Sequence, residues 1–372
     1  MGYESPTRME VFLENVRHNW GEVRKLVGPD REIYAVIKAD AYGHGAVKLA
    51  RVCRDAGCKN FAVARVDEAI ELREAGITES ILVLGQASLD SADTTLRHDI
   101  TCACAEMAYA RELSRAAVAS GKKGKIHVKI NSGMNRLGFR PKDFERSVDA
   151  LFSLPGLDID GIFTHFAVAD ETRPDYTDMQ FGQFSQALDL LKKKGLKVRV
   201  RHACNSAAVL THPDKYLDAV RPGIMLYGVC PLPVMPEGVH LRPAFAFKSA
   251  VASIHDTDPG SGVGYGLRYV TRGKERTAVV PVGYGDGWTR TLSMKTGVLI
   301  RGRRCPVVGT ICMDQLMVDV TDLDRVELGD EVVLLGKQGD ESITVEEIAA
   351  LRETIPHEIS IALLKRVRRV YI

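Results

Sequence analysis

The sequence predicts an α/β fold, a (β/α)₈ TIM barrel followed by a mostly β C-terminal domain. Two observations lead to this prediction. Short runs of β-branched and apolar residues recur through the first two-thirds of the chain, and stretches with apolar residues at helical spacing separate them. Beyond about residue 241, short alternating segments and turns rich in Gly, Asp and Lys take over, which is typical of an all-β domain.

Eight apolar runs predict strands of the first domain, at residues 33–38, 60–64, 81–85, 100–105, 126–130, 159–165, 198–202 and 219–227. Helical spacing lies between them, at residues 45–56, 66–75, 107–120, 141–151 and 179–194. Strands that alternate with helices form βαβ units and hence a parallel sheet. Eight such units within about 230 residues fit a closed barrel, whose usual length is about 250 residues. An open doubly wound sheet is the alternative on this pattern alone.

The C-terminal domain shows six alternating segments, at residues 245–254, 277–281, 298–301, 306–308, 316–320 and 331–335. One helix is expected near residues 345–353. The stretch 229–240 contains three prolines and predicts a linker. We therefore expect a barrel over residues 1–240 and a β-rich domain over residues 241–372.

Composition narrows the classes of partner. The 372 residues carry 50 Lys and Arg against 48 Asp and Glu, so no strong overall field attracts nucleic acid or an anionic membrane. The eight cysteines are scattered without C-x-x-C pairs, which favours free thiols in a reducing compartment. The first residues resemble no secretory signal, and no stretch reaches the roughly 20 apolar residues of a membrane span. A soluble, cytoplasmic protein is expected.

Charged and polar residues follow the predicted barrel strands, where the reactive groups of such barrels gather. They are Lys38, Lys129 with Arg136 in the next loop, His165, Asn205 with Ser206, and Arg221 with Gly223. A lysine that ends an apolar strand can be desolvated, which lowers its pKa and frees the amine to form an imine. A snorkelling lysine is the simpler interpretation of Lys38 taken alone.

A phosphate site is predicted near the last two strands, where barrels commonly bind phosphate through backbone N–H groups. Ser206 and Gly223 occur there, although a helix N-cap and a turn are the alternatives. Tyr42, shortly after Lys38, could also reach a phosphate. Together with the strand-end lysine, these residues favour one bound phosphate.

Eight segments resemble alanine racemases in their order along the chain, and the resemblance covers essentially all of it: VIKADAYGHG, HVKINSGMNRLGF, THFAVAD, HACNSAA, RPGIMLYG, GVGYG, VGYGDGW and GTICMDQLMVDVT. The resemblance implies a barrel with a β domain, pyridoxal 5'-phosphate as cofactor, and a head-to-tail homodimer with shared active sites. It also implies interconversion of L- and D-alanine, which supplies D-alanine for peptidoglycan.

The same resemblance implies residue roles. Lys38 would carry the cofactor as a Schiff base and act as one base, while Tyr265 of the partner subunit would act on the opposite face. Because tyrosine is ordinarily a poor base at neutral pH, Tyr265 would need positive charge nearby. The other implied roles are cofactor binding by Tyr42, His165, Asn205, Ser206, Arg221, Gly223 and Ile224, substrate binding by Arg136 and Met313, and carbamylation of Lys129 to orient Arg136.

Two positions depart from the family pattern. Asn131 replaces an acidic residue near Arg136, and Lys365 stands where relatives usually have a phosphate-binding tyrosine, which puts cofactor affinity and pocket shape in question. The glycine clusters lack the G-x-G-x-x-G spacing of a dinucleotide site. The remaining histidines singled out are interpreted as surface or structural: His44, His202 and His357.

Three other functions fit part of the pattern. A racemase for serine or another small amino acid would share the bases and differ in its pocket. A decarboxylase of basic amino acids would share barrel and cofactor but gives no reason for Tyr265 within GVGYG. A non-catalytic protein of pyridoxal-phosphate homeostasis would consist of the barrel only, so the β-rich domain disfavours it.

Overall fold

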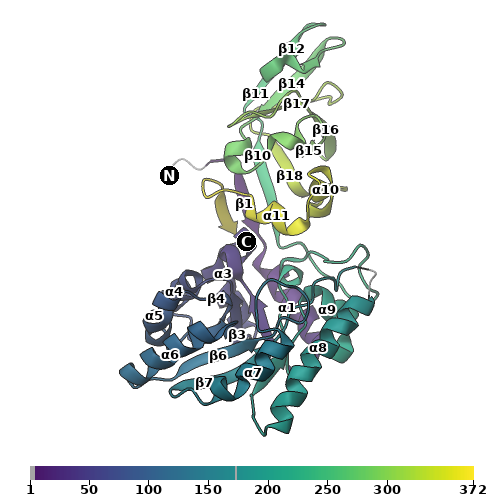
Figure 1. Cartoon of the computed structure of the whole chain (residues 1–372). Coiled ribbons are helices and arrows are strands. Elements are labelled where there is room, and N and C mark those ends of the chain that lie inside the picture. The colour runs from purple at the N-terminus through teal and green to yellow at the C-terminus, as the bar shows by residue number, and fades with distance from the viewer. Residues whose placement is uncertain (1–4, 172–173) are drawn as a thin grey trace. The chain divides into compact units, whose positions relative to one another are not determined.

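The structure, a computed structural model, describes residues 5–171 and 174–372. The chain divides into two compact units (Figure 1). The barrel unit comprises residues Asn15–Ala41 and Gly45–Arg242, and the β-rich unit comprises the N-terminal residues up to Glu14, Tyr42–His44 and Pro243–Ile372. The N-terminal segment therefore lies with the β-rich unit, whereas the sequence assigned it to the barrel.

Eight parallel strands close into the predicted barrel, because the last strand pairs back to the first. They are β2 (Glu32–Val36), β3 (Asn60–Val63), β4 (Ser80–Gln86), β5 (Thr101–Cys104), β6 (Gly124–Lys129), β7 (Leu157–Phe163), β8 (Val200–His202) and β9 (Ala219–Val220). Closure confirms the TIM barrel and excludes the open sheet. The predicted strand 219–227 is reduced to β9 and a 3₁₀ turn, η3 (Ile224–Tyr227), so its length was wrong.

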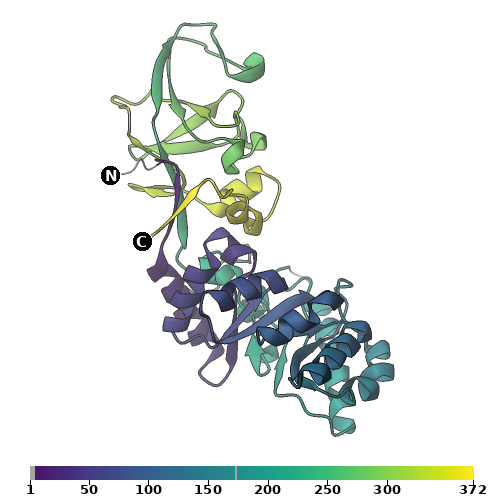
Figure 2. The same cartoon turned by 90° about the vertical axis from the view of Figure 1, so that its left-hand side faces the viewer.

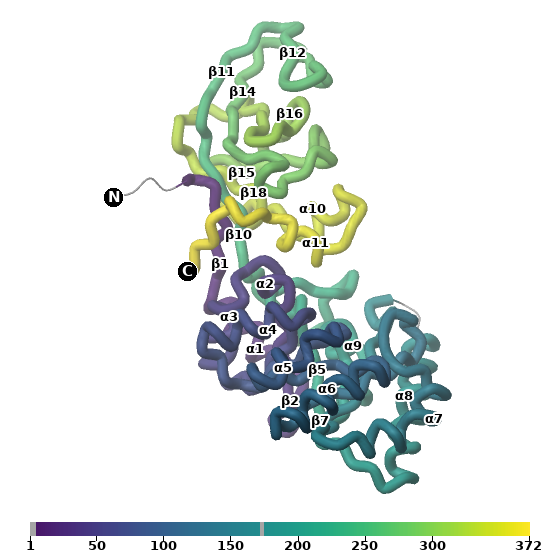
Figure 3. Tube along the Cα trace, turned by 60° about the vertical axis from the view of Figure 1, so that its left-hand side comes forward, coloured from purple at the N-terminus to yellow at the C-terminus, as the bar shows by residue number. Residues whose placement is uncertain are grey.

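Helices surround the barrel, as Figure 3 shows for α3 to α6. They are α1 (Leu13–Val27), α3 (Ala46–Asp55), α4 (Val66–Glu74), α5 (Ala92–Arg97), α6 (Met107–Ser120), α7 (Pro141–Phe152), α8 (Pro174–Lys193) and α9 (Ser206–Thr211). In α6, Tyr109, Ala110, Leu113 and Ala117 are buried at helical spacing, which gives the helix one apolar face. The helix ends at Gly121, whose φ of 65° suits glycine.

The β-rich unit is built on one large sheet with strand order β11-β14-β17-β16-β15-β18-β10-β1-β20. Its strands are β1 (Arg8–Val11), β10 (Phe245–Ala250), β11 (Ser253–Thr257), β14 (Glu275–Val280), β15 (Gly297–Ile300), β16 (Arg303–Val308), β17 (Leu316–Asp319), β18 (Glu331–Gln338) and β20 (Arg368–Tyr371). Smaller strands are β12 (Gly262–Val263), β13 (Tyr269–Val270) and β19 (Glu341–Ile343). The predicted strand 245–254 was wrong as one element, because β10 and β11 replace it.

The two ends of the chain meet in this sheet. β1 pairs antiparallel with β10 and parallel with β20, and Figure 2 shows the purple N-terminal strand beside the yellow C-terminal strand. Two α-helices are present where one was predicted, α10 (Val345–Leu351) and α11 (Pro356–Ile361). Across residues 5–171 and 174–372, no helix has both the length and the apolar character that crossing a membrane requires.

Candidate active site

The predicted barrel residues gather at the carboxyl ends of the strands. Lys129 is the last residue of β6, and His165 lies two residues beyond β7. Lys38 does not end its strand as predicted, because β2 stops at Val36 and Lys38 begins the next element, α2 (Lys38–Gly43). The end of the barrel expected to carry the chemistry is therefore occupied by cationic and imidazole side chains.

Element α2 has an uncommon backbone. Its residues Ala39, Asp40, Ala41 and Tyr42 all have φ between 51° and 54°, in the left-handed region. Each such non-glycine residue costs roughly 1–2 kcal/mol, so neighbouring groups must stabilise the segment. The Ala39 N–H donates to Glu68 Oε1 at 2.5 Å, and the carboxylate of Asp40 accepts from the N–H of Ala46 at 2.7 Å. The start of α4 thus fixes the backbone next to Lys38.

Four cations influence one another at this end of the barrel, Lys38, Lys129, Arg136 and Arg221. Burial lowers the pKa of Lys38, reinforced by Arg136 and opposed by Glu68. Burial, together with the charges of the three other cations, lowers the pKa of Lys129 to about 7. Within the described residues no carboxylate forms an ion pair with Lys129 Nζ, which lies 4.5 Å from the centre of the Phe163 ring. Such a site favours an anionic ligand.

Three of the predicted residues, Lys129, Arg136 and His165, line one small cavity of about 10 Å³. Burial lowers the pKa of His165 well below its usual value, and Arg221 and the other cations add to this effect. His165 is therefore a neutral imidazole at neutral pH in this environment. Arg136, the predicted substrate residue, is the exposed member of the group.

Arg221 is almost completely buried and held by several acceptors. Its Nη1 donates to His202 Nδ1 at 2.7 Å, and its Nη2 donates to the carbonyl oxygens of Thr164 (2.7 Å) and Ala203 (2.9 Å). His165 Nδ1 lies 3.4 Å from Nη2. The guanidinium is thereby fixed between β8 and the residues that follow β7, beside Lys129.

His202 was not recognised from the sequence as part of this site. It is fully buried, stacked between the rings of Phe163 (centroids 4.8 Å apart) and Tyr34 (5.4 Å), so of the two predicted alternatives, surface or structural, the structure excludes the surface position. His44 is also fully buried, which excludes the surface alternative and leaves the structural one. The sequence did contain a signal for buried histidines near the site. His127 stands two residues before Lys129 on β6 and therefore on the same face of the strand, and its Nδ1 lies 2.9 Å from His202 Nε2.

The predicted phosphate residues come together between the ends of β8 and β9. Ser206 Oγ accepts from the N–H of Gly223 at 2.8 Å, and the neighbouring Ile224 is buried. Asn205, rather than Ser206, caps α9, because its side chain accepts from the N–H of Ala208 at 3.0 Å. The N-cap alternative for Ser206 was therefore wrong, and its hydroxyl instead joins two adjacent strand ends.

The remaining predicted residues belong to the β-rich unit. Tyr265 begins the 3₁₀ turn η4 (Tyr265–Leu267) and is 72% exposed, and Met313 is 53% exposed. Thr310 Oγ1 donates to the carbonyl oxygen of Tyr265 at 2.9 Å, which attaches the two segments to each other. Tyr42 is buried, and burial raises the pKa of its phenol. Lys365 is exposed.

An arginine next to Lys365 stabilises the Met313 segment. Arg366 forms ion pairs with Asp286 and Asp314, each at 2.7 Å, and its Nη2 donates to the carbonyl oxygen of Met313 at 3.3 Å. Both carboxylates raise the pKa of Arg366. These contacts of Arg366 join residues far apart along the chain and were not predicted from the sequence.

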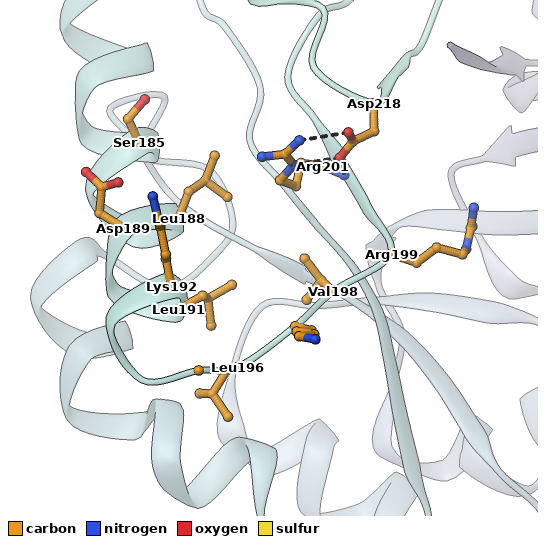
Figure 4. A pocket seen from close by; sticks show the side chains of 12 residues that line it. Ser185, Leu188, Asp189, Leu191, Lys192, Leu196, Val198, Arg199, Arg201 and Asp218 are labelled. Carbon is orange, nitrogen blue, oxygen red and sulfur yellow. Dashed lines mark hydrogen bonds and ion pairs between the residues drawn. The ribbon is translucent and has the colours of Figure 1, made fainter. Parts of the chain in front are cut away.

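A larger groove, of about 630 Å³, lies elsewhere on the barrel (Figure 4). It is lined by α8 and by the segment that leads into β8, at the amino end of that strand. Arg201 and Asp218, joined in Figure 4, form an ion pair at 2.6 Å. The groove contains none of the predicted site residues and lies away from the carboxyl ends of the strands, so we exclude it as the catalytic centre.

Both units match known families. Residues 11–231 match the family described as "Alanine racemase, N-terminal domain", and residues 244–371 match "Alanine racemase, C-terminal domain". The chain is 42% identical over 368 residues to "Alanine racemase 2" of Caldanaerobacter subterraneus subsp. tengcongensis, covering 99% of this chain and 95% of that protein.

Solved structures agree with the sequence matches. The chain resembles an alanine racemase of Clostridium difficile 630 with a TM-score of 0.95 and 40% identity, covering 100% of this chain and 97% of that one. It also resembles the alanine racemase of Bacillus anthracis with bound L-Ala-P, with a TM-score of 0.93 and 36% identity, covering 100% and 96% of the two chains.

Proposed function

Because the chain belongs to the alanine racemase family, we propose that it interconverts L- and D-alanine with pyridoxal 5'-phosphate as cofactor. Full-length identity of about 40% to several relatives makes the protein an amino-acid racemase. The observation that carries the proposal is the carboxyl end of the barrel, where Lys38 has a lowered pKa among three other cations.

The residues present fit a phosphorylated aldehyde. Such a ligand needs an amine that is partly unprotonated and a polar pocket for its phosphate. Burial lowers the pKa of Lys38, which favours the first requirement, and Ser206 with Gly223 and Ile224 supports the second. When bound, the cofactor withdraws electrons from the substrate Cα and so makes its proton removable.

The proposed residue roles are of two kinds: proton transfer at Cα, and binding of the substrate and the cofactor. Lys38 and Tyr265 take and return the proton at Cα on opposite faces, since a single base can hardly serve both. Arg136 and Met313 hold the substrate. Cofactor contacts are assigned to Lys38, Tyr42, His165, Asn205, Ser206, Arg221, Gly223 and Ile224.

We assign Arg221 to the ring nitrogen of the cofactor. A guanidinium can donate hydrogen bonds but not accept them, so it keeps its partner nitrogen unprotonated. The Nε of Arg221 has no hydrogen-bond partner within the described residues, whereas both Nη atoms are engaged. The Nε–H and one N–H of Nη1 are thus left as donors for a ligand.

Lys129 is proposed to be carbamylated. In that step the unprotonated amine adds to carbon dioxide, forms an N–C bond and releases one proton. A pKa of about 7 supplies the unprotonated amine at neutral pH, and the surrounding cations favour the anionic product. The resulting carboxylate would share the small cavity with Arg136 and could orient it toward a substrate carboxylate.

The β-rich domain, expected at residues 241–372, is proposed to supply Tyr265 and Met313 to the active site of the partner subunit in a homodimer. Both side chains are exposed in a single chain, which supports this assignment. We place the enzyme in the cytoplasm, where D-alanine would enter peptidoglycan synthesis. All eight cysteines are free thiols, as a reducing compartment would allow.

The test is racemisation by the purified protein loaded with pyridoxal 5'-phosphate. L-alanine, D-alanine and L-serine are incubated separately, and the enantiomers are measured by chiral chromatography. We expect conversion of alanine in both directions. In Lys38→Ala the racemisation rate should fall by roughly 10²–10⁴-fold. Serine racemised faster than alanine would reassign the substrate, and no product from any small amino acid would overturn the proposal.

A further inference from the structure

A chain of hydrogen bonds runs through the interior of the barrel from Arg221. Arg221 Nη1 lies 2.7 Å from His202 Nδ1, and His202 Nε2 lies 2.9 Å from His127 Nδ1. His127 Nε2 lies 3.4 Å from Asp160 Oδ2. We call the four residues Arg221, His202, His127 and Asp160 the buried histidine chain.

The buried histidine chain reaches from the carboxyl end of the barrel toward its amino end. His127 is on β6, Asp160 on β7 and His202 on β8, and both imidazoles are essentially inaccessible to solvent. At the far end, Asp160 accepts two hydrogen bonds from Arg199, both at 2.8 Å. Arg199 also pairs with Glu32 and lines the groove of Figure 4.

The two ends of this chain determine where its protons lie. Guanidinium groups only donate, so His202 Nδ1 must accept and carry no proton. His202 Nε2 then carries the proton and donates to His127 Nδ1. His127 in turn donates from Nε2 to the carboxylate of Asp160, which only accepts. Both histidines are thereby neutral and in the Nε2–H form.

We propose that His202 is a positioning residue for Arg221, held in the Nε2–H tautomer by His127 and Asp160. This inference rests on the proposed function, because Arg221 is assigned there to the ring nitrogen of the cofactor. With one Nη fixed by His202 and the other by two carbonyl oxygens, the guanidinium is oriented with Nε toward the ligand side.

The electrostatic surroundings agree with two neutral imidazoles. Burial lowers the pKa of His202 well below its usual value, and Arg221, His127, Lys129 and Arg199 lower it further. Burial also lowers the pKa of His127, as does Arg199, whereas Asp160 and Glu32 oppose the shift. A protonated His202 would turn an N–H toward a second cation 2.7 Å away, so its charging is disfavoured.

A purely structural role is the competing explanation, since His202 fills the space between Phe163 and Tyr34. Two substitutions of His202 distinguish this structural role from the proposed positioning role. In His202→Asn the side-chain oxygen can occupy the place of Nδ1 and still accept from Arg221. In His202→Gln the longer side chain can occupy the place of Nε2 and bind His127, but it leaves Arg221 without its acceptor. Both variants lose the ring.

The first measurement is the dissociation constant of pyridoxal 5'-phosphate from the folded protein, followed by fluorescence, with urea unfolding as a check on folding. We expect His202→Asn to stay within about threefold of the original protein. His202→Gln should bind at least roughly tenfold more weakly, as expected for loss of a hydrogen bond to a charged group. Equal affinities of the two variants would overturn the positioning role.

The second measurement needs no cofactor. With ¹⁵N-labelled histidine, NMR of the folded chain reports each tautomer and charge, and His127→Asn and His202→Asn assign the signals. We expect both histidines in the Nε2–H form from about pH 6 to 9, although free histidine titrates near 6.5. An Nδ1–H form or a titration of either residue would overturn the inference.

The outcomes separate the two proposals. If the protein racemises alanine while His202→Asn and His202→Gln bind the cofactor equally, only the positioning role fails. If the protein neither binds pyridoxal 5'-phosphate nor racemises amino acids, the proposed function fails, and NMR still decides the tautomers.

Discussion

At the scale of single residues, the candidate site contains two lysines, Lys38 and Lys129, whose pKa values are lowered by burial. Lys129 has a pKa of about 7 because it is buried among other cations, whereas a lysine in an unfolded chain has a pKa near 10.4. Between these values the unfolded chain binds more protons than the folded one. The free energy of unfolding should therefore rise with pH in this window as the cost of burying the charged amine disappears.

Lys129→Met tests this reasoning by removing the titrating group. At pH 7 the variant should be more stable than the original protein. Its advantage should shrink by up to about 1.4 kcal/mol per pH unit between about pH 7 and 10. The measurement is urea unfolding at several pH values in carbonate-free buffer, because carbon dioxide would change the charge of Lys129.

Lys142→Met is the matched control, since Lys142 is exposed on α7. It should change stability by less than about 0.5 kcal/mol at every pH. A difference between Lys129→Met and the original protein that does not vary with pH would show that Lys129 is charged, or uncharged, in both folded and unfolded chains.

Some site residues could be found in the sequence and others could not, for a physical reason. Lys38, Lys129 and Arg221 could be found because each is a charged residue within or at the end of an apolar run. Glu68 could not, because one of its partners, the backbone N–H of Ala39, is presented to it only by the left-handed turn there. His202 ends a strand of three residues, which is too short for alternation to show which face is buried.

At the scale of elements, the left-handed segment α2 decides where Lys38 lies. Glu68 supports it from the first turn of α4, accepting at 2.5 Å from Ala39 and at 2.7 and 3.0 Å from the N–H groups of Ala64 and Arg65. One carboxylate thus joins the end of β3, the start of α4 and the start of α2. Glutamine cannot replace all of these acceptors, because one of its two polar atoms is a donor.

Glu68→Gln should lower the free energy of unfolding by roughly 0.5–1.5 kcal/mol, the net contribution of a hydrogen bond, because the N–H groups of Ala39 and Arg65 are exposed and that of Ala64 is part-buried. It should also weaken pyridoxal 5'-phosphate binding by about tenfold or more, since Lys38 directly precedes the destabilised turn. Urea unfolding and cofactor titration measure the two effects.

Glu71→Gln, one turn further along the exposed side of the same helix, provides the control. It should change stability by less than about 0.5 kcal/mol and leave cofactor affinity unchanged. If Glu68→Gln behaved like Glu71→Gln, the carboxylate would not be what holds α2 in its left-handed form.

The elements that local sequence predicted well are those with a clear period. Helix α6 was predicted with its observed bounds, whereas the predicted strand 219–227 is mostly a 3₁₀ turn. All four residues of η3 are buried, and a fully buried run has no periodicity to distinguish turn from strand. Strand β1 was missed because its partners, β10 and β20, lie more than 200 residues away along the chain.

At the scale of the whole molecule, the proposal requires two chains for each active site. Lys38 and Arg221 belong to the barrel unit, whereas Tyr265 and Met313 belong to the β-rich unit and are 72% and 53% exposed in a single chain. In a symmetric dimer, each β-rich unit would then complete the barrel of the other chain.

Mixing two inactive variants tests this sharing directly. Lys38→Ala lacks the cofactor lysine, and Tyr265→Phe lacks the opposing base. A mixed dimer has one site with both defects and one site with neither, provided that Tyr265 acts on the partner's barrel. Random reassociation makes half of the dimers mixed, so alanine racemisation should recover to about a quarter of the original activity.

The control pairs Lys38→Ala with Arg221→Ala, two changes within the barrel unit, which leave every site of a mixed dimer defective. This pair should remain inactive after the same reassociation. Native mass spectrometry of differently tagged chains verifies that subunits have exchanged. If exchange is complete and Lys38→Ala with Tyr265→Phe recovers no activity, Tyr265 must serve the barrel of its own chain, and the exposed tyrosine would require a different explanation.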